Sequence, residues 1–324
     1  MENRPKILVV GSLVMDQIMT TAVFPRPGQT VLGKGFCKAP GGKGANQAVQ
    51  MSRLGADVAM FGKLGHDSNG SELIAACREA GIDCSMIHFD EHEPSACSVI
   101  ILEVQPDGST QNRIIVNSGA NMSIRPEELK ELEDKVASFD MVALQLEIPM
   151  QINELIAEYA YKKGVPVMLN SAPYAPLSDS LLSHLSFISP NETEAEDLTG
   201  IAIRVDGKVD LTNAKCAAMQ LRRKGVKNVL ITLGSAGALL LNDDGCIHSP
   251  CATNISAVDP TAAGDSFVGA FCYAVCCGRP WEEVLEFANH CAALTVSAMG
   301  AMPSLPTLDK VNGMLKSRGK RSFS

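Results

Sequence analysis

Short, wholly apolar segments recur along the chain between helical patterns, and this alternation limits the fold more than any other feature. Examples are Ile7-Leu-Val-Val10 and Met141-Val-Ala-Leu144, and the strand-like segment Val229–Thr232 is apolar up to its last residue. Continuous apolar runs of this length are typical of strands that are buried on both faces of a parallel sheet. The helical stretches between them end at glycines such as Gly55 and Gly164. The sequence therefore predicts an α/β fold with a doubly wound, mostly parallel central sheet flanked by helices.

Two regions interrupt this alternation. Residues 16–36 and 97–116 consist of strand-like pieces between turn residues, and Pro106-Asp-Gly108 is typical of a hairpin turn. We expect these two segments to form a small β-sheet lid beside the main sheet. The chain contains no internal repeat and no low-complexity linker, so a single domain over residues 1–324 is predicted.

Composition argues against several classes of partner. The net charge of −8 disfavours nucleic acid. The 11 cysteines include no CxxC pair and no spaced Cys/His set, which argues against zinc and suits free thiols in a reducing compartment. No apolar run approaches the roughly 20 residues of a membrane span, and the polar start at Met1 lacks the apolar core of a secretion signal. We therefore expect a cytoplasmic protein without a membrane partner.

The segment Asp-Pro-Thr-Ala-Ala-Gly-Asp-Ser-Phe, residues 259–267, opens a stretch that is expected to be helical from Asp265 to about Met299. Backbone amides at a helix start lack helical partners, and together with the helix dipole they attract anions. The small residues before Asp265 allow a large anion to approach. A carboxylate there can accept a proton from a hydroxyl while the amides stabilise developing charge, a combination that is typical of phosphoryl transfer. The simpler alternative is that Asp265 only caps the helix.

A second glycine-rich motif, Gly41-Gly-Lys-Gly-Ala-Asn46, begins another predicted helix. Its glycines allow a ligand to contact the backbone, Lys43 adds a mobile cation, and Asn46 can donate to and accept from a hydroxyl. Asp16, shortly after the first strand, is able to chelate neighbouring sugar hydroxyls. Each feature has an ordinary alternative, because the motif can be a tight turn at a helix start and Asp16 a solvated turn residue.

Polar groups in two later segments suit a metal and a nucleotide. Asn191 and Glu194 are three residues apart on one predicted helix face, and their oxygens suit hydrated magnesium. The alternative is an ordinary acidic first turn, which the helix dipole favours. The segment Thr232-Leu-Gly-Ser-Ala-Gly237 follows a strand and is small and polar enough to border a phosphate tail.

Two nucleotide fingerprints are excluded. Residues 28–34 match GxxxxGK, but Gly35 stands where a P-loop has its magnesium-binding hydroxyl. Gly11 after the first strand does not begin a GxGxxG motif, which disfavours a dehydrogenase.

Taken together, the motifs resemble those of the ribokinase-like carbohydrate kinases, the phosphofructokinase-B family, nearly from end to end. The matching segments are Gly11-Ser12, Asp16, Gly41-Gly-Lys-Gly-Ala-Asn-Gln-Ala48, Ser118-Gly-Ala-Asn121, Gln145-Leu-Glu147, Asn191-Glu-Thr-Glu194, Thr232-Leu-Gly-Ser235, Asp259 to Phe267, and Gly300-Ala-Met-Pro-Ser304. The resemblance implies the ribokinase-like fold with its lid and ATP-dependent phosphorylation of a sugar's primary hydroxyl. The expected reaction phosphorylates the 5-hydroxyl of D-ribose and gives ribose 5-phosphate and ADP.

The resemblance also implies roles for individual residues. Asp265 would be the base, and the amides of Ala262, Ala263 and Gly264 would hold the transferring phosphoryl group. The residues that would hold the sugar are Asp16, Gly42, Lys43, Asn46 and Glu147, with Lys43 also near the phosphates. The residues that would line the ATP site are Asn191, Thr232, Gly234, Ser235, Gly237, Gly264 and Asn289. Glu194 would act on magnesium through water.

A potassium site and a dimer are implied in the same way. Members of the family bind a monovalent cation, usually potassium, beside the anion hole. Here its ligands would be Asp259, Ser304 and backbone oxygens of Thr261, Thr295, Ala298 and Gly300. The family's lid often pairs between two subunits, so a homodimer formed through the β lid is expected.

One position departs from the family pattern. Enzymes of this type usually have asparagine two residues before the sugar-binding aspartate, and this chain has Val14. Valine cannot pair with a hydroxyl, and an unpaired buried hydroxyl costs about 1–3 kcal/mol. The alternative function is therefore a deoxyribokinase or a nucleoside kinase. A non-catalytic sugar-sensing protein is a remote alternative, which the intact Asp265 and its small neighbours disfavour.

Overall fold

The computed structural model of the protein describes residues 4–105, 110–253 and 255–323. Its body contains a nine-stranded sheet with the order β15-β14-β13-β10-β9-β8-β1-β4-β5. The strands from β13 to β5 run parallel, and β14 and β15 are antiparallel at one edge. The bounds are Lys6–Val10 (β1), Asp57–Gly65 (β4), Asp83–Asp90 (β5), Met141–Gln145 (β8), Val167–Asn170 (β9), Phe187–Ile188 (β10), Asn228–Thr232 (β13), Ala238–Asn242 (β14) and Gly245–Ser249 (β15). The predicted doubly wound, mostly parallel sheet is confirmed.

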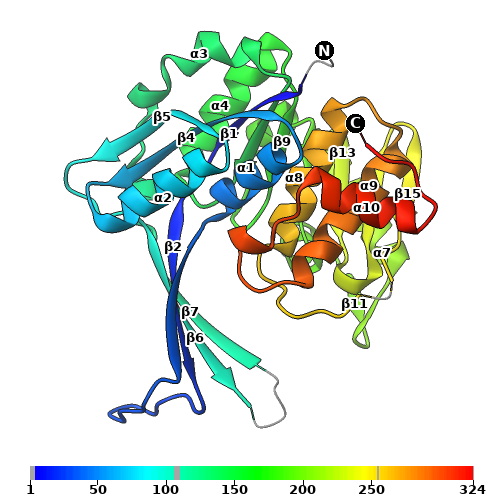
Figure 1. Ribbon diagram of the computed structural model, residues 1–324. Coiled ribbons are helices and arrows are strands. Elements are labelled where there is room, and N and C mark those ends of the chain that lie inside the picture. Colours follow the sequence, from blue (N-terminus) through cyan, green and yellow to red (C-terminus); the bar gives the residue numbers. More distant parts are fainter. Residues whose placement is uncertain (1–3, 106–109, 254, 324) are drawn as a thin grey trace.

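Helices cover both faces of this sheet (Figure 1). The helices on one face are α1 (Lys43–Arg53), α2 (Ser68–Glu79), α8 (Ala263–Cys276), α9 (Trp281–Val296) and α10 (Leu308–Ser317). The helices on the other face are α3 (Leu132–Lys135), α4 (Met150–Lys163), α5 (Asp179–His184), α6 (Glu192–Thr199) and α7 (Leu211–Arg223). Short 3-10 turns occupy Gly119–Ser123, Pro126–Leu129, Val136–Ser138, Gly234–Ala236 and Met302–Ser304.

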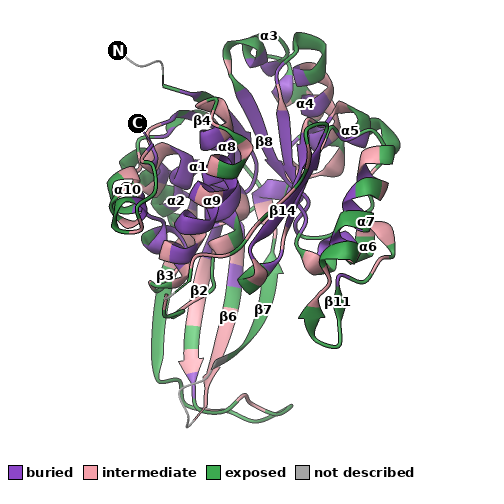
Figure 2. Cartoon of the chain, turned by 90° about the vertical axis from the view of Figure 1, so that its right-hand side faces the viewer, coloured by how far each residue is buried: buried purple, intermediate pink, exposed green. Residues whose placement is uncertain are grey.

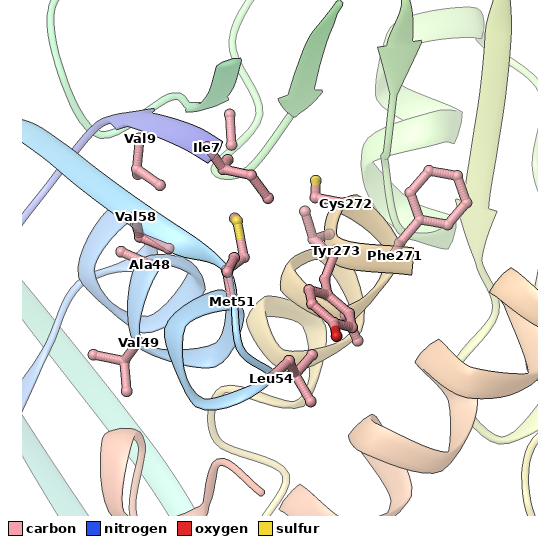
Figure 3. Close-up of a cluster of buried hydrophobic side chains, with 14 of the residues drawn as sticks. Ile7, Val9, Ala48, Val49, Met51, Leu54, Val58, Phe271, Cys272 and Tyr273 are labelled. Atoms are coloured by element: carbon pink, nitrogen blue, oxygen red, sulfur yellow. The ribbon is translucent and has the colours of Figure 1, made fainter. Parts of the chain in front are cut away.

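Successive residues of the first strand serve the two faces in turn. Ile7 and Val9 belong to the core beneath α1 and α8, whereas Leu8 and Val10 belong to the opposite core. All four are fully buried, and each contributes about 1.5–3 kcal/mol through burial of its side chain. Figure 3 shows Ile7 and Val9 facing Met51 and its neighbours on α1. This two-sided burial explains why β1 is apolar at every position after the exposed Lys6.

The lid is a separate four-stranded sheet with the order β3-β2-β6-β7. Its strands are β2 (Val14–Thr21), β3 (Gly35–Gly41), β6 (Cys97–Val104) and β7 (Thr110–Asn117). It extends away from the body (Figure 1), and its residues are largely half-buried or exposed (Figure 2). The predicted lid is thus confirmed, while the expected hairpin turn at 106–108 lies outside the described residues. A small hairpin of Arg204–Val205 (β11) and Lys208–Val209 (β12) completes the strands.

Two predicted elements differ from the structure. The helix expected from Asp265 to Met299 is two helices, because Gly278 has φ 66° and Pro280 begins the next helix. The helical pattern near Pro126 forms only short 3-10 turns and the four-residue α3. Within the part of the chain that the structure describes, no helix is both long and apolar enough to cross a bilayer.

Candidate active site

A cavity of about 230 Å³ lies where α8, α1 and α6 point their first turns toward the carboxyl ends of β9, β10 and β13. It is lined by Lys43, Asn170, Ala172, Ser189, Asn191, Glu194, Thr232, Pro260, Ala262, Gly264, Asp265 and Val268. Residues from distant parts of the sequence therefore meet at one place. Crevices at this edge of an open α/β sheet are the usual binding sites of the fold class.

The amino-terminal turn of α8 forms one wall. Ala262 precedes the helix in the left-handed conformation, with φ 59° and ψ 9°. Ala262 and Gly264 line the cavity, whereas the Ala263 amide donates to the Pro260 carbonyl at 3.2 Å. Two of the three small residues predicted to hold a phosphoryl group thus face the cavity, and the amide of the third closes a turn. The positive end of the α8 dipole points into this space.

Asp265 lies in the first turn of α8, with a side chain only 7% exposed. Its two carboxylate oxygens accept hydrogen bonds from neighbouring residues of α1. Asn46 Nδ2 donates to Oδ2 at 2.9 Å, and Gln47 Nε2 donates to Oδ1 at 3.1 Å. Asn46 was predicted from the sequence as a sugar ligand, but Gln47 was not singled out. Its position inside the glycine-rich motif was the only available signal.

The start of α1 packs tightly on the chain after β1. Gly42 has φ 91°, and a Cβ atom there would lie 2.7 Å from the Val14 amide nitrogen. Ser12 Oγ donates to Glu147 Oε2, which also accepts from the Lys43 amide at 3.0 Å. These contacts bring the predicted sugar ligands Gly42, Lys43 and Glu147 together. Val14 is 6% exposed and is the first residue of β2.

Asp16 projects from β2 near the same centre. It accepts a hydrogen bond from Ser98 Oγ of β6, so its position is fixed within the lid. Burial raises the pKa of the Asp16 carboxyl, the Ser98 hydrogen bond offsets part of this, and the charges of Glu147 and Asp265 raise the pKa further. The effect of Glu147 and Asp265 on the pKa of Asp16 indicates that these three predicted site residues lie close enough together to interact through their charges.

Lys43 is the cation of this environment. Burial alone would lower the pKa of its ammonium, but the charges of Asp265, Glu147 and Glu194 outweigh burial and raise the pKa. Lys43 therefore remains protonated at neutral pH and can accompany an anionic ligand in the cavity.

Asn191 and Glu194 close the start of α6 as a reciprocal capping box. Asn191 Oδ1 accepts from the Glu194 amide, and Glu194 Oε2 accepts from the Asn191 amide, both at 2.9 Å. Burial raises the pKa of Glu194, against the Asn191 hydrogen bond and the Lys43 charge that lower it. Both residues line the cavity, so the capping role and a metal role are compatible. A buried carboxylate such as that of Glu194, facing a polar cavity, suits a hydrated magnesium ion, which keeps several waters.

The predicted nucleotide residues divide into two groups. Thr232 lines the cavity at the end of β13, and the Gly234–Ala236 turn and Gly237 follow it. Asn289 of α9 is 4% exposed and donates through Nδ2 to Ser249 and to the Pro250 carbonyl. The amide of Asn289 therefore holds the segment after β15, and this residue is not among those that line the cavity.

Three of the six predicted potassium ligands, Asp259, Thr261 and Gly300, are joined by hydrogen bonds close to the start of α8, whereas Thr295, Ala298 and Ser304 bond to other groups. Asp259 Oδ1 accepts from the amide and hydroxyl of Thr261, and Oδ2 accepts from the Gly300 amide at 2.9 Å. Burial raises the pKa of Asp259, but these hydrogen bonds outweigh it and lower the pKa. Ser304 Oγ donates to Ala301, and Thr295 Oγ1 donates within the α8–α9 contact. One carboxylate among several neutral oxygens suits a monovalent cation. Within residues 4–105, 110–253 and 255–323, no three His, Cys, Asp or Glu side chains form a metal cluster.

Comparison with known proteins agrees with this geometry. Residues 4–308 match the family model described as pfkB family carbohydrate kinase. A ribokinase of Schizosaccharomyces pombe is 38% identical over 95% of this chain and 96% of its own. A deoxyribokinase of Salmonella typhimurium is 31% identical over 95% of this chain and 98% of its own. The structure of Arabidopsis thaliana ribokinase complexed with ribose and ATP superposes with a TM-score of 0.89 at 34% identity, covering 97% of this chain and 99% of that one.

Proposed function

This chain belongs to the pfkB family of carbohydrate kinases, and on that basis we propose that it transfers the terminal phosphoryl group of ATP to the 5-hydroxyl of D-ribose, giving ribose 5-phosphate and ADP. The observation that carries the proposal is the buried Asp265 carboxylate in the first turn of α8, beside a cavity that Ala262, Gly264 and Lys43 also line. A base, an anion-binding helix start and a cation are thus placed together, as phosphoryl transfer requires. The ribose and ATP of the Arabidopsis relative support the choice of substrates.

In the proposed reaction Asp265 accepts the proton of the sugar hydroxyl as the oxygen attacks phosphorus. The α8 dipole and the Ala262 and Gly264 backbone stabilise the negative charge on the transferring group. Lys43 stays protonated and neutralises phosphate charge on the opposite wall. A magnesium ion near Glu194 would supply further charge neutralisation to the ATP phosphates.

The sugar would lie between the lid and the start of α1. Asp16, fixed by Ser98, would accept from sugar hydroxyls, while Asn46 would pair with the hydroxyl near Asp265. Glu147 holds the Lys43 amide and Ser12, so it fixes the loop on which the sugar rests. Orientation by these fixed groups supplies the alignment on which catalysis depends.

The test is a coupled assay of ATP consumption with ribose, using the native protein and the Asp265→Asn variant. Loss of a general base reduces turnover by roughly 10²–10⁴-fold, so kcat should fall to that extent. Calorimetry should show that the variant still binds ribose, because the ligands of the sugar are intact. Consumption of ATP by Asp265→Asn at the native rate would overturn the proposal.

Val14 favours a second candidate, phosphorylation of 2-deoxyribose or of a nucleoside. Its apolar, buried side chain replaces the asparagine that would pair with a sugar hydroxyl, and the deoxyribokinase relative shows that the family includes such an activity. Turnover of ribose, deoxyribose and nucleosides should be compared in the native protein and in Val14→Asn. A strong native preference for ribose that Val14→Asn does not improve would exclude this candidate.

We further propose potassium activation through the Asp259 cluster. The rate should rise when potassium replaces sodium in the coupled assay. If Asp259→Ala responds to potassium like the native protein, the site lies elsewhere.

A homodimer formed through the lid is also proposed. Phe36 and Ile115 on the lid strands are 59% and 73% exposed, which is unusual for large apolar side chains and suits a partner surface. Light scattering after size exclusion should give twice the 34.4 kDa chain mass, and Ile115→Lys should reduce it to one chain. None of the 11 cysteines, all of which lie in the described residues, forms a disulfide, which suits a cytoplasmic location.

A further inference from the structure

We infer that Gln47 is the positioning residue of the proposed base, holding one oxygen of Asp265 so that the other faces the sugar hydroxyl. The inference rests on the proposed function and deepens it. Gln47 is fully buried on α1, directly after Asn46.

Both polar ends of the Gln47 side chain are engaged. Its Nε2 donates to Asp265 Oδ1 and to Asn170 Oδ1, each at 3.1 Å. Its Oε1 accepts from Gln145 Nε2 at 2.7 Å. Two amide hydrogens and one carbonyl oxygen thus meet two acceptors and one donor, so the side chain has no freedom to turn without losing hydrogen bonds.

The orientation of the Gln47 amide is set by its two partners other than Asp265, namely Asn170 and Gln145. Asn170 Nδ2 donates to the Ser189 carbonyl at 2.9 Å, which turns the Asn170 oxygen toward Gln47. Gln145 reaches Gln47 because Gly11 has no side chain, and a Cβ at Gly11 would lie 2.0 Å from Gln145 Oε1. If Gln47 were reversed, its oxygen would face the Asp265 carboxylate and the Asn170 oxygen. The network therefore presents an N–H group to Asp265 and not an oxygen.

The second donor to Asp265 is held differently. Asn46 Nδ2 donates to Asp265 Oδ2, but Asn46 Oδ1 is buried without a hydrogen-bond partner. A sugar hydroxyl entering the site can therefore satisfy Asn46 and take its place at Asp265 Oδ2. Gln47 keeps its hydrogen bond to Oδ1 during this exchange, because its other hydrogen bonds, to Asn170 and Gln145, do not involve the sugar. The carboxylate then meets the hydroxyl in a fixed orientation.

The charges around Asp265 allow this role to be tested by pH. The charged groups around Asp265 are Lys43 of α1, Asp16 of β2 and Glu194 of α6. The charge of Asp265 contributes to the raised pKa of each of them. Gln47→Glu keeps the shape of the side chain but replaces the donor by a second carboxylate. Like charges at this separation resist ionisation together, so the acidic limb of the kcat profile should move upward by about one pH unit.

The experiment compares Gln47→Glu and Gln47→Met with Gln50→Met. Gln50 is also fully buried on α1, where its side chain accepts from Ser266 Oγ and donates to the Pro306 carbonyl, with no hydrogen bond to Asp265. It is therefore matched for burial, and its replacement removes two buried hydrogen bonds where that of Gln47 removes three. Gln47→Met should lower kcat about 10- to 100-fold with little change in KM for ATP, because the base is misaligned. Gln50→Met should lower the unfolding temperature comparably and leave the pH profile in place.

The outcomes separate this inference from the proposed function. If Gln47→Met is folded and matches Gln50→Met in kcat, the positioning role is wrong, even when Asp265→Asn is inactive. An unmoved acidic limb in folded Gln47→Glu would contradict it equally. If Asp265→Asn itself remains active, the proposed base is wrong and the failure lies with the function.

Discussion

Asn121 binds the backbone of Leu13 at both its donor and its acceptor. Its Oδ1 accepts from the Leu13 amide at 3.2 Å, and its Nδ2 donates to the Leu13 carbonyl at 2.9 Å, across 108 residues of sequence. Leu13 lies between Ser12, which bonds Glu147, and Val14, which packs on Gly42. One buried side chain after the lid therefore fixes the loop against which α1 begins.

Asn121→Ala should lose stability and weaken sugar binding together. Two buried backbone groups would lose their partners, at about 1–3 kcal/mol each. Asn312 is a matched control, since it binds the amide and carbonyl of Phe323 in the same way, far from the cavity. Chemical denaturation should show a loss in both variants, while KM for the sugar should rise only in Asn121→Ala. An unchanged KM would show that the loop is fixed by other contacts.

Ala262→Gly should not destabilise the protein, although glycine in a helix interior is destabilising. Ala262 has φ 59°, a conformation that costs a residue with a Cβ about 1–2 kcal/mol. Removing this strain offsets the roughly 0.5–1 kcal/mol that glycine loses in conformational freedom. The free energy of unfolding should stay level or rise. Ala75→Gly, in the exposed middle of α2, should lose about 1 kcal/mol. Equal losses in the two variants would argue against strain at Ala262.

Asp16→Asn should make the protein more stable at neutral pH while removing a sugar ligand. Burial raises the folded-state pKa of Asp16 above its ordinary value of 3.8, so its ionisation destabilises the fold as pH rises through the folded pKa. Thermal unfolding near pH 8 should therefore occur at a higher temperature in the variant, and the difference should vanish toward pH 4.

Asp67→Asn should change the stability near pH 8 in the opposite direction to Asp16→Asn. Burial would raise the pKa of Asp67, but hydrogen bonds from Gly70 and Ser95 outweigh it and lower the pKa. The Asp67 carboxylate therefore stabilises the fold above its ordinary pKa, and this stability is lost as pH falls through the lowered pKa. Asp67→Asn should unfold at a lower temperature near pH 8. A shift in the same direction in both variants would refute the electrostatic account.

The carboxyl-terminal segment should contribute to stability through Phe323. Phe323 is 5% exposed, and its ring stacks on Phe287 of α9 with a centroid distance of 4.0 Å. The Arg279 guanidinium lies over the same Phe323 ring, 4.9 Å from its centroid. Phe323→Ala should cost about 3 kcal/mol of unfolding free energy, measured by denaturant titration. Phe323→Leu retains most of the apolar volume and should lose less. If Phe323→Ala lowered the unfolding free energy by no more than a substitution at an exposed surface position does, the ring would not be packed in solution.

The fold was predictable where each residue of a strand is buried. Residues 7–10 and 141–144 are apolar throughout, since both faces of the sheet are covered. By contrast, β5 was not predicted, because at the sheet edge its buried residues alternate with exposed polar ones. The break at Gly278 was missed although the sequence carries a signal for it, since a glycine followed two residues later by Pro280 is typical of a helix end.

The site was predictable to the extent that its chemistry lies in local motifs. The start of α8 and the glycine-rich start of α1 were recognised for this reason. From the sequence, Asn191 and Glu194 were open between a magnesium role and an ordinary acidic first turn; the structure shows a reciprocal capping box at this helix start, and the metal role stays a proposal. Gln47 depends on partners 98 to 218 residues away, and no local pattern distinguishes a buried glutamine of this kind.

One of the connections between the lid and the body, from β3 to α1, is one residue long. β3 ends at Gly41 and α1 begins at Lys43, so only Gly42 separates the lid sheet from the helix that carries the cavity's cation. Rotation of the lid strands would pass directly into the first turn of α1, with no loop to absorb it. Under the proposed function, a movement of the lid on sugar binding would therefore shift the Lys43 ammonium through this short connection.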